Sequence, residues 1–185
     1  MRTLLREVSK AVVLAAGLGL CLVAPAAASA DRSTADGPAA LAEFRTIVSW
    51  HTGTCVDVDG ASQTSGAKVQ IYTCNGTVAQ LWEKLPTDSG YFRLRVAASG
   101  QCMAVKDASQ AESAPVVQNP CNLDFNQQWK EGDSGVAGFP QLVARHSGKV
   151  LIMRSEALAD RTPLIQVTYG GPGSDPLHST AWQFR

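Results

Sequence analysis

The segment Ala79-Gln80-Leu81-Trp82 returns 47 residues later as Asn126-Gln127-Gln128-Trp129. Both segments end in Gln-x-Trp, and both tryptophans lie eight residues after a cysteine, Cys74 in one case and Cys121 in the other. An offset that is the same at several anchor residues indicates an internal repeat. The fold must therefore be built from copies of one unit.

The repeat extends over the rest of the chain, with a third copy that has diverged further. His51-Thr52-Gly53-Thr54-Cys55 matches Ala98-Ser99-Gly100-Gln101-Cys102, and both match His146-Ser147-Gly148-Lys149-Val150. The third copy ends at Thr180-Ala181-Trp182. The 185-residue chain thus contains three units of about 47 residues, with expected boundaries at about 44–90, 91–138 and 139–185.

Each unit contains four short apolar runs separated by Gly, Ser, Asn or Asp, a pattern that predicts strands rather than helices. One unit is too small to bury a core alone, and three units are too few to close a propeller. We therefore expect an all-β domain in which three copies close one barrel around a common axis, with hairpins capping one mouth. The twelve expected strands are 44–50, 54–58, 69–72, 82–85, 91–97, 102–105, 116–118, 129–130, 139–145, 150–154, 164–167 and 182–184.

Four cysteines follow the first thirty residues, and their spacing predicts two disulfides. Four cysteines allow three pairings, and equivalence of the repeats selects Cys55–Cys74 and Cys102–Cys121. The absence of a Cys-x-x-Cys pair argues against zinc. The third copy has Val150 at the first cysteine position and Tyr169 or Gly170 at the second, so we expect it to be held by packing alone.

The first thirty residues have the layout of a secretory signal peptide. A basic start precedes an apolar run over residues 11–24, and Ala28-Ser29-Ala30 supplies the small residues of a cleavage site. We expect cleavage, a secreted product in an oxidising compartment, and a flexible lead-in over residues 31–43. The alternative is an uncleaved anchor, because residues 11–30 are nearly long enough to span a bilayer.

The charge pattern excludes several classes of partner. The chain has 16 basic and 16 acidic residues, and no run of Lys or Arg occurs in it. Binding to nucleic acid or to an anionic membrane surface needs clustered positive charge, so neither is expected, and no membrane insertion is expected after signal cleavage. No nucleophile elbow, zinc-protease motif or phosphate loop is present. We expect a monomer without a metal ion, cofactor or catalytic residues.

A family resemblance becomes visible in the first copy. Cys55-Val56-Asp57-Val58, the segment from Val69 to Gly76 and Gln80-Leu81-Trp82 resemble one repeat of the ricin-B-type β-trefoil lectins, also known as R-type lectins or carbohydrate-binding modules. The resemblance covers residues 44–185 and implies a β-trefoil with a shallow sugar site available to each repeat. An Asp after the first Cys accepts hydrogen bonds from vicinal hydroxyls, and an aromatic ring stacks on the apolar face of the sugar.

The resemblance assigns a carbohydrate site to the first copy, at Asp57, Gln70, Tyr72 and Gln80. Ala79 stands where the family has an Asn, which removes one hydrogen-bonding amide. Structural roles remain open for the same residues. Asp57 could cap a turn, Tyr72 could be an ordinary exposed aromatic residue, and the Gln of Gln-x-Trp is expected to bond to the backbone or a loop and fix a turn.

The other two copies depart from the pattern. In the second copy Ala104 replaces the Asp and Asn119 replaces the aromatic residue. In the third copy Ile152 replaces the Asp, while Val167 or Thr168 takes the aromatic position, because the register is ambiguous by one residue. We expect the second site to be lost or rebuilt and the third to be lost.

The sequence therefore predicts a secreted, stand-alone carbohydrate-binding module that is not an enzyme, with a mono-, oligo- or polysaccharide as its partner. The first alternative is a protein-binding trefoil, such as a hydrolase inhibitor or a surface-interaction module. The second is a small glycoside hydrolase, for which acidic pairs such as Asp57 and Asp59 would have to flank a bond at a defined separation.

Overall fold

The computed structural model describes residues 43–154, 159–171 and 179–185. The expected signal segment 1–30 and lead-in residues 31–42 lie outside these ranges. The first repeat contains β1 (Phe44–Arg45), β2 (Ile47–Ser49), β3 (Cys55–Val58), η1 (Asp59–Ala61), β4 (Val69–Tyr72), η2 (Val78–Gln80) and β5 (Trp82–Pro86). The second contains β6 (Phe92–Val96), β7 (Cys102–Val105), η3 (Lys106–Ala108), β8 (Val116–Asn119), η4 (Phe125–Gln127) and β9 (Trp129–Gly132). The third contains β10 (Gln141–Ala144), β11 (Val150–Met153), β12 (Leu164–Val167) and β13 (Trp182–Phe184).

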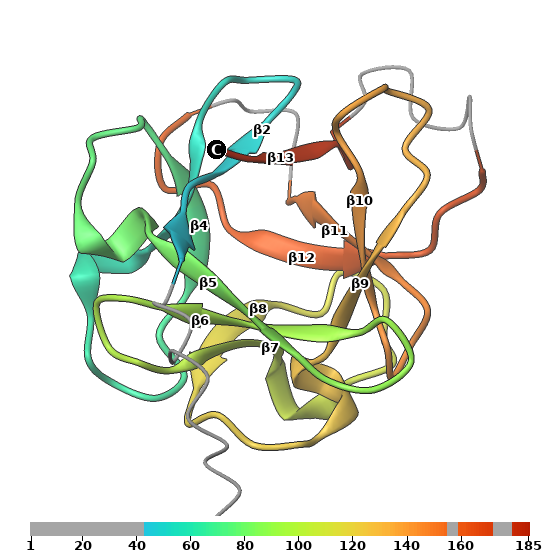
Figure 1. Cartoon of the computed structure of the whole chain (residues 1–185), viewed down its shortest axis with the longest axis horizontal. Helices are drawn as coiled ribbons and strands as arrows, with labels where there is room; N and C mark the ends of the chain where they lie inside the picture. Colours follow the sequence, from blue (N-terminus) through green and yellow to red (C-terminus); the bar gives the residue numbers. More distant parts are fainter. Residues whose placement is uncertain (1–42, 155–158, 172–178) are drawn as a thin grey trace, which may run out of the picture. The chain divides into compact units, whose positions relative to one another are not determined.

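Strands β5, β6, β9, β10 and β13, together with β1 and β2 as two halves of one strand, form a barrel, and the three repeats lie side by side around its centre (Figure 1). Strands β5, β6, β9 and β10 pair in that order, and β13 pairs with β2. The backbone N–H of Trp182 donates to the carbonyl of Pro140 at 2.9 Å, which joins β13 to the segment before β10. This arrangement confirms the predicted all-β trefoil. No helix in the described ranges is long and apolar enough to cross a membrane.

The described chain has thirteen strands instead of twelve, because the expected strand 44–50 is divided at Thr46. Strand β1 pairs with β5, whereas β2 pairs with β13. At the division, Thr46 and Arg185 exchange backbone hydrogen bonds of 2.9 Å. The first strand of the barrel thus changes partner midway, as closing the ring between the first and last repeats requires.

Three hairpins, β3–β4, β7–β8 and β11–β12, form the cap that the repeat pattern predicts. Isolated bridges join each hairpin to the next, for example between Lys68 and Val117. The ladders also remove the register ambiguity of the third repeat. Val150 pairs with Val167 as Cys55 pairs with Tyr72, so Val167 stands at the aromatic position.

Alternation along the strands directs apolar side chains into one shared core. In β6, Phe92, Leu94 and Val96 are buried, whereas the two arginines between them are partly exposed, as the period of two in a strand requires. The tryptophans of the three Gln-x-Trp positions are at most 1% exposed. Each donates its indole N–H to a backbone carbonyl at the equivalent position of its own repeat: Val56, Met103 and Leu151.

Both predicted disulfides are present. Cys55 is bonded to Cys74 and Cys102 to Cys121, each across a sequence separation of 19 residues. Each bond ties the first residue of one hairpin strand to the chain just after the second strand. In the unfolded state such a bond restricts the chain, which is the main source of its stabilising effect in the loop-entropy description.

The expectation that packing alone holds the third repeat is wrong. The Glu112 carboxylate accepts hydrogen bonds from the backbone N–H and hydroxyl of Thr168 and from the ammonium of Lys149. These contacts, above all that with Lys149, lower the pKa of Glu112 to about 2. A loop of the second repeat therefore ties the open end of β11–β12, where the other repeats have a disulfide.

Buried amides connect successive repeats. The Gln118 amide donates to the carbonyls of Ser62 and Thr64, in the β3–β4 loop of the preceding repeat, at 2.8 and 2.9 Å. Gln166 makes the equivalent contacts with the β7–β8 loop, at 2.8 and 3.1 Å. The first repeat has Ile71 at this position, and its side chain has no polar atom with which to hold the loop of the third repeat.

The disulfide of the second repeat should contribute strongly to stability. We expect Cys102→Ser/Cys121→Ser to lose about 3 kcal/mol of unfolding free energy, because a loop of this length is no longer closed in the unfolded state. Urea denaturation with intrinsic tryptophan fluorescence measures the loss. A control with Cys55→Ser/Cys74→Ser should lose a similar amount, and an unchanged urea midpoint in either variant would contradict the expectation.

Candidate functional site

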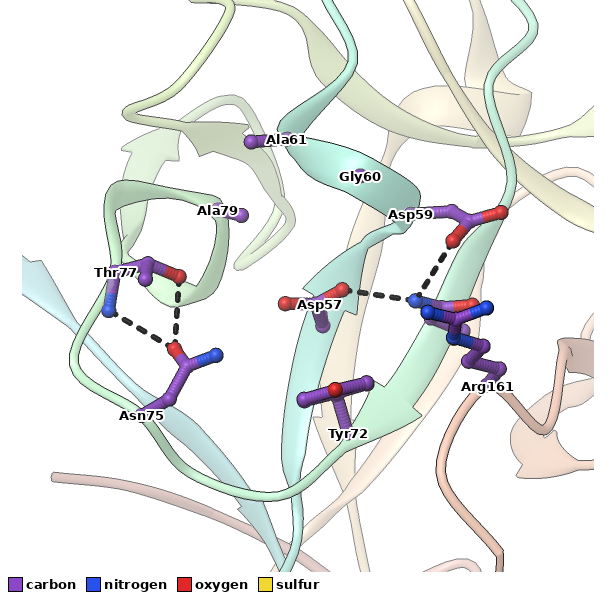
Figure 2. Close-up of a pocket in the computed structure, with 10 residues that line it drawn as sticks. Asp57, Asp59, Gly60, Ala61, Tyr72, Asn75, Thr77, Ala79 and Arg161 are labelled. Atoms are coloured by element: carbon purple, nitrogen blue, oxygen red, sulfur yellow. Dashed lines mark hydrogen bonds between the residues drawn. The ribbon is translucent and has the colours of Figure 1, made fainter.

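A hollow of about 320 Å³ lies over the first hairpin (Figure 2). Asp57 of β3 and Gln70 of β4 face each other in the ladder, so both side chains emerge on the same side of the hairpin. Tyr72 lies two residues after Gln70 and points to the same side. The lining consists of Asp57, Asp59, Gly60, Ala61, Gln70, Tyr72, Asn75, Thr77, Ala79 and Arg161.

Two amides fix the carboxylate of Asp57. Nε2 of Gln70 donates to one carboxylate oxygen at 3.0 Å, and Nε2 of Gln80 donates to the other at 3.2 Å. Asp57 is only 6% exposed. A carboxylate held from two sides keeps one orientation, and its remaining lone pairs are available to donors that enter the hollow.

Gln80 lies behind the hollow and does not line it. It is fully buried and also donates to the carbonyl of Thr73 at 3.1 Å, while its side-chain oxygen accepts from the backbone N–H of Asn75 at 2.9 Å. Gln127 repeats these loop contacts in the second repeat. The Gln of the Gln-x-Trp ending therefore fixes a turn, as the sequence predicts, and in the first repeat it also orients Asp57.

Gln70 lines the hollow although only 1% of its surface is exposed. Its amide nitrogen is shared between Asp57 and Asp59, with Nε2–Oδ1 distances of 3.0 and 3.2 Å. Its side-chain oxygen has no hydrogen-bond partner among the described residues. A buried acceptor without a partner is unfavourable, so this oxygen is suited to accept a hydrogen bond from a ligand.

Burial raises the pKa of Asp57 above the ordinary value of an aspartate, because removal of water disfavours its charge. The hydrogen bonds from Gln70 and Gln80 oppose this shift, while the charges of Asp59 and Asp160 add to it. The site thus holds a partly desolvated carboxylate. Hydrogen bonds from hydroxyls to such a group are stronger than those to a fully hydrated one.

Tyr72 supplies the aromatic surface of the hollow. It is the last residue of β4, and its ring is partly exposed. Figure 2 shows that Tyr72 and Asp57 come from adjacent strands and point toward one hollow. The structure thus brings together three of the four residues proposed from the sequence, Asp57, Gln70 and Tyr72, on the surface of the hollow, with Gln80 behind them.

Sequence reasoning missed several lining residues. Asn75 and Thr77 form one wall, where the Asn75 side-chain oxygen accepts from the backbone N–H and the hydroxyl of Thr77 at 3.1 and 2.8 Å. Asp59 lies at the other side of the hollow, and its carboxylate forms an ion pair with the ammonium of Lys68, with an N–O distance of 3.4 Å. Its position two residues after Asp57 in the sequence was a usable signal.

Arg161 also lines the hollow, although it belongs to the third repeat. Its backbone N–H donates to the carbonyl of Ile71 at 2.9 Å, which places the loop after β11 beside β4. No local motif could have indicated this residue, because the hairpin cap brings it to the first repeat across 89 residues of sequence.

The second repeat keeps a hollow of about 410 Å³ with a different lining. Ala104, at the position of Asp57, is fully buried and absent from that lining. Asn119, at the position of Tyr72, accepts hydrogen bonds from the Ser65 hydroxyl and the Gly66 backbone N–H at 2.9 and 3.1 Å. Its side-chain oxygen therefore holds the neighbouring loop.

The third repeat has an apolar pair, Ile152 and Ile165, where the first has Asp57 and Gln70. In the described ranges, no group of three or more His, Cys, Asp or Glu side chains could hold a metal ion. The polar set that the family resemblance assigns to a sugar is therefore assembled on the first repeat.

Comparison with known proteins gives the family. The sequence model described as "Ricin-type beta-trefoil lectin domain-like" matches residues 42–118 and 84–167. The designed threefold-symmetric protein ThreeFoil is 33% identical, with a TM-score of 0.70, over 76% of this chain and 96% of that one. No curated protein sequence matches significantly.

Two natural proteins have the same fold. An exo-β-1,3-galactanase from Clostridium thermocellum is 26% identical, with a TM-score of 0.70, over 76% of this chain and 29% of that one. A ricin B-like lectin from Macrolepiota procera, solved with lactose, is 16% identical, with a TM-score of 0.64, over 77% of this chain and 94% of that one. The threefold barrel, the paired cysteines and the family match agree, and the chain belongs to the ricin-type β-trefoil lectin domain-like family.

Proposed function

We propose that the protein is a secreted, non-catalytic carbohydrate-binding protein that binds a sugar in the hollow of its first repeat. The observation that carries the proposal is the fixed carboxylate of Asp57 beside the ring of Tyr72. A pyranose has a polar rim and an apolar face, and these two groups meet both requirements.

The other lining groups complete the polar rim. The free oxygen of Gln70 accepts from a third hydroxyl, and the wall of Asn75 and Thr77 offers an amide and a hydroxyl. Ala79 contributes no polar group at the position of the family's Asn, so we expect this wall to contact the sugar less closely. One shallow hollow of this kind binds weakly, and strong binding to a surface requires several molecules acting together.

The family supports the choice of a carbohydrate. The titles of the structural neighbours name lactose for the Macrolepiota procera lectin and a sialylated epitope for the Polyporus squamosus lectin. Those two chains are 16% and 13% identical to this one, so they support the class of ligand and not a particular sugar.

The geometry favours binding over catalysis. Both carboxylate oxygens of Asp57 accept hydrogen bonds from amides that cannot take part in proton transfer. The second carboxylate, that of Asp59, accepts from Gln70 and is paired with Lys68. Glycosidases place two carboxyl groups on opposite sides of the scissile bond, whereas these two share one amide donor.

The proposal is tested on a glycan array with the wild-type protein and two aromatic variants. Tyr72→Ala should weaken binding about tenfold, because the sugar loses its stacking surface. Trp50→Ala removes an exposed ring that does not line the hollow, so it should bind as the wild type does. If Trp50→Ala lost binding while Tyr72→Ala kept it, the proposed site would be wrong.

A further inference from the structure

We propose that the hollow of the first repeat selects glycans that carry an anion, either a sugar carboxylate or a sulfate ester, and that Arg161 of the third repeat binds this group. The inference rests on the proposed function and adds a substrate class to it. It concerns a residue that lies outside the repeat carrying Asp57 and Tyr72.

Arg161 lies across the hollow from Asn75 and Thr77 (Figure 2). Two contacts hold its backbone there. Its N–H donates to the carbonyl of Ile71 at 2.9 Å, and its carbonyl accepts from the ammonium of Lys68 at 3.4 Å. The side chain of Arg161 is therefore attached to a backbone that is held in place at the edge of the hollow.

Among the residues that the structure describes, the charge of Arg161 has no partner. Its guanidinium makes no hydrogen bond and no ion pair with any described residue. The nearby carboxylates are engaged by other donors: Asp59 by Gln70 and Lys68, and Asp160 by the backbone N–H and hydroxyl of Thr73. No described residue thus uses the donors of the guanidinium, whose planar arrangement matches a carboxylate or a sulfate.

The fold requires a left-handed backbone at the position of Arg161 in each repeat, and glycine takes this position only in the first. The φ of Arg161, 72°, lies in the left-handed region, and the equivalent positions in the other loops are Gly66, at 82°, and Ser113, at 59°. All three donate their N–H to the matching strand of the next repeat. Glycine adopts this conformation without strain, and strained non-glycine residues are concentrated at functional sites.

A neutral sugar leaves part of the hollow unused. It satisfies Asp57 and the free oxygen of Gln70 through its hydroxyls, because both are acceptors. Arg161 is a donor with a positive charge, and an anionic substituent is its strongest partner. A sugar that carries an anionic group as well as hydroxyls therefore binds the acceptors, Asp57 and Gln70, and the donor, Arg161, at the same time.

The experiment uses isothermal titration calorimetry with three matched monosaccharides: galactose, galacturonic acid and 6-sulfated galactose. The wild-type protein should bind at least one acidic sugar about tenfold more tightly than the neutral one, and this preference should decrease with added salt. The two acidic sugars distinguish a carboxylate from a sulfate as the preferred anion.

Arg161→Gln should remove the preference for an acidic sugar over the neutral one. Arg161→Gly should do the same and keep or raise the melting temperature, because it relieves the backbone strain. Arg154→Gln, in the same connection but outside the lining, removes an equal charge and should keep the preference. Arg161→Lys should keep part of it.

The outcomes separate this inference from the proposed function. Binding of neutral and acidic sugars with equal affinity, or a preference that survives Arg161→Gln, would overturn the role of Arg161 while the sugar site stands. A preference that Arg154→Gln also removes would overturn it too, because only overall charge would then matter. Failure of all glycans to bind would overturn both.

Discussion

Asp57→Ala should reduce the affinity for a glycan at least about 100-fold. The carboxylate is expected to accept hydrogen bonds from two hydroxyls, each such bond to a charged group contributes about 1.5–3 kcal/mol, and about 1.4 kcal/mol corresponds to a factor of ten. Calorimetry with any sugar that binds the wild-type protein measures the loss. Binding that survives the substitution would place the sugar site elsewhere.

The same variant should remain folded. Removal of Asp57 leaves the amide of Gln70 bonded to Asp59 and that of Gln80 bonded to the carbonyl of Thr73. It also removes a charge that burial disfavours. We therefore expect only a small change in melting temperature. Asp57→Asn is the matched control, because it keeps the shape of the side chain. This variant should also bind poorly, because its amide NH2 group faces the NH2 donor of one of the two glutamines, where the carboxylate oxygen had accepted a hydrogen bond.

Acidic pH should weaken sugar binding by the wild-type protein, as Asp57→Ala does. Burial raises the pKa of Asp57, so its carboxylate becomes protonated at a higher pH than that of an ordinary aspartate, and sugar binding should weaken there as the pH falls. The contribution of Asp57 to the stability of the fold changes with pH in the opposite direction from sugar binding. The contribution of Asp57 is most favourable below its unfolded pKa and is lost as the pH rises through the raised folded pKa. Loss of binding at mildly acidic pH would thus not reflect unfolding through Asp57.

Trp129→Ala should lower the unfolding free energy by about 4 kcal/mol, within the usual 3–5 kcal/mol for a buried tryptophan. The ring is fully buried in the core shared by the three repeats, and its N–H donates to the carbonyl of Met103 at 3.2 Å. The substitution leaves a cavity and a buried carbonyl without its partner. Urea denaturation followed by circular dichroism measures the change.

A matched control exists in the same chain. Trp50 is 51% exposed and packs its ring against Phe139 at a centroid distance of 4.8 Å. Trp50→Ala should change the unfolding free energy by only about 0.5 kcal/mol, as most surface substitutions do. If Trp129→Ala proved no more destabilising than Trp50→Ala, the three tryptophans would not form the core on which the fold depends.

The fold was predictable because its signals are local and repeated. Equal spacing between Cys74 and Trp82 and between Cys121 and Trp129 reveals the threefold unit, and the unit limits how the cysteines can pair. The division of the first strand at Thr46 was not predictable. It follows from closure of the barrel between the first and last repeats, and closure is a property of the whole ring.

The candidate site was only partly predictable, for the same physical reason. Asp57, Gln70 and Tyr72 lie on one hairpin, so strand alternation and family resemblance both point to them. Arg161 reaches them only through contacts between hairpins. The anchoring of the third repeat by Glu112 was missed likewise, because this residue belongs to the second repeat.

Arg161 belongs to the third repeat but lines the hollow of the first, and this has a consequence for protein engineering. A chimera made by exchanging a complete 47-residue unit between two such lectins would carry Asp57 and Tyr72 to the new host but leave Arg161 behind. Its ligand preference would then be a hybrid of donor and recipient. Successful transplantation has to move the hairpin together with the adjoining turn of the last unit.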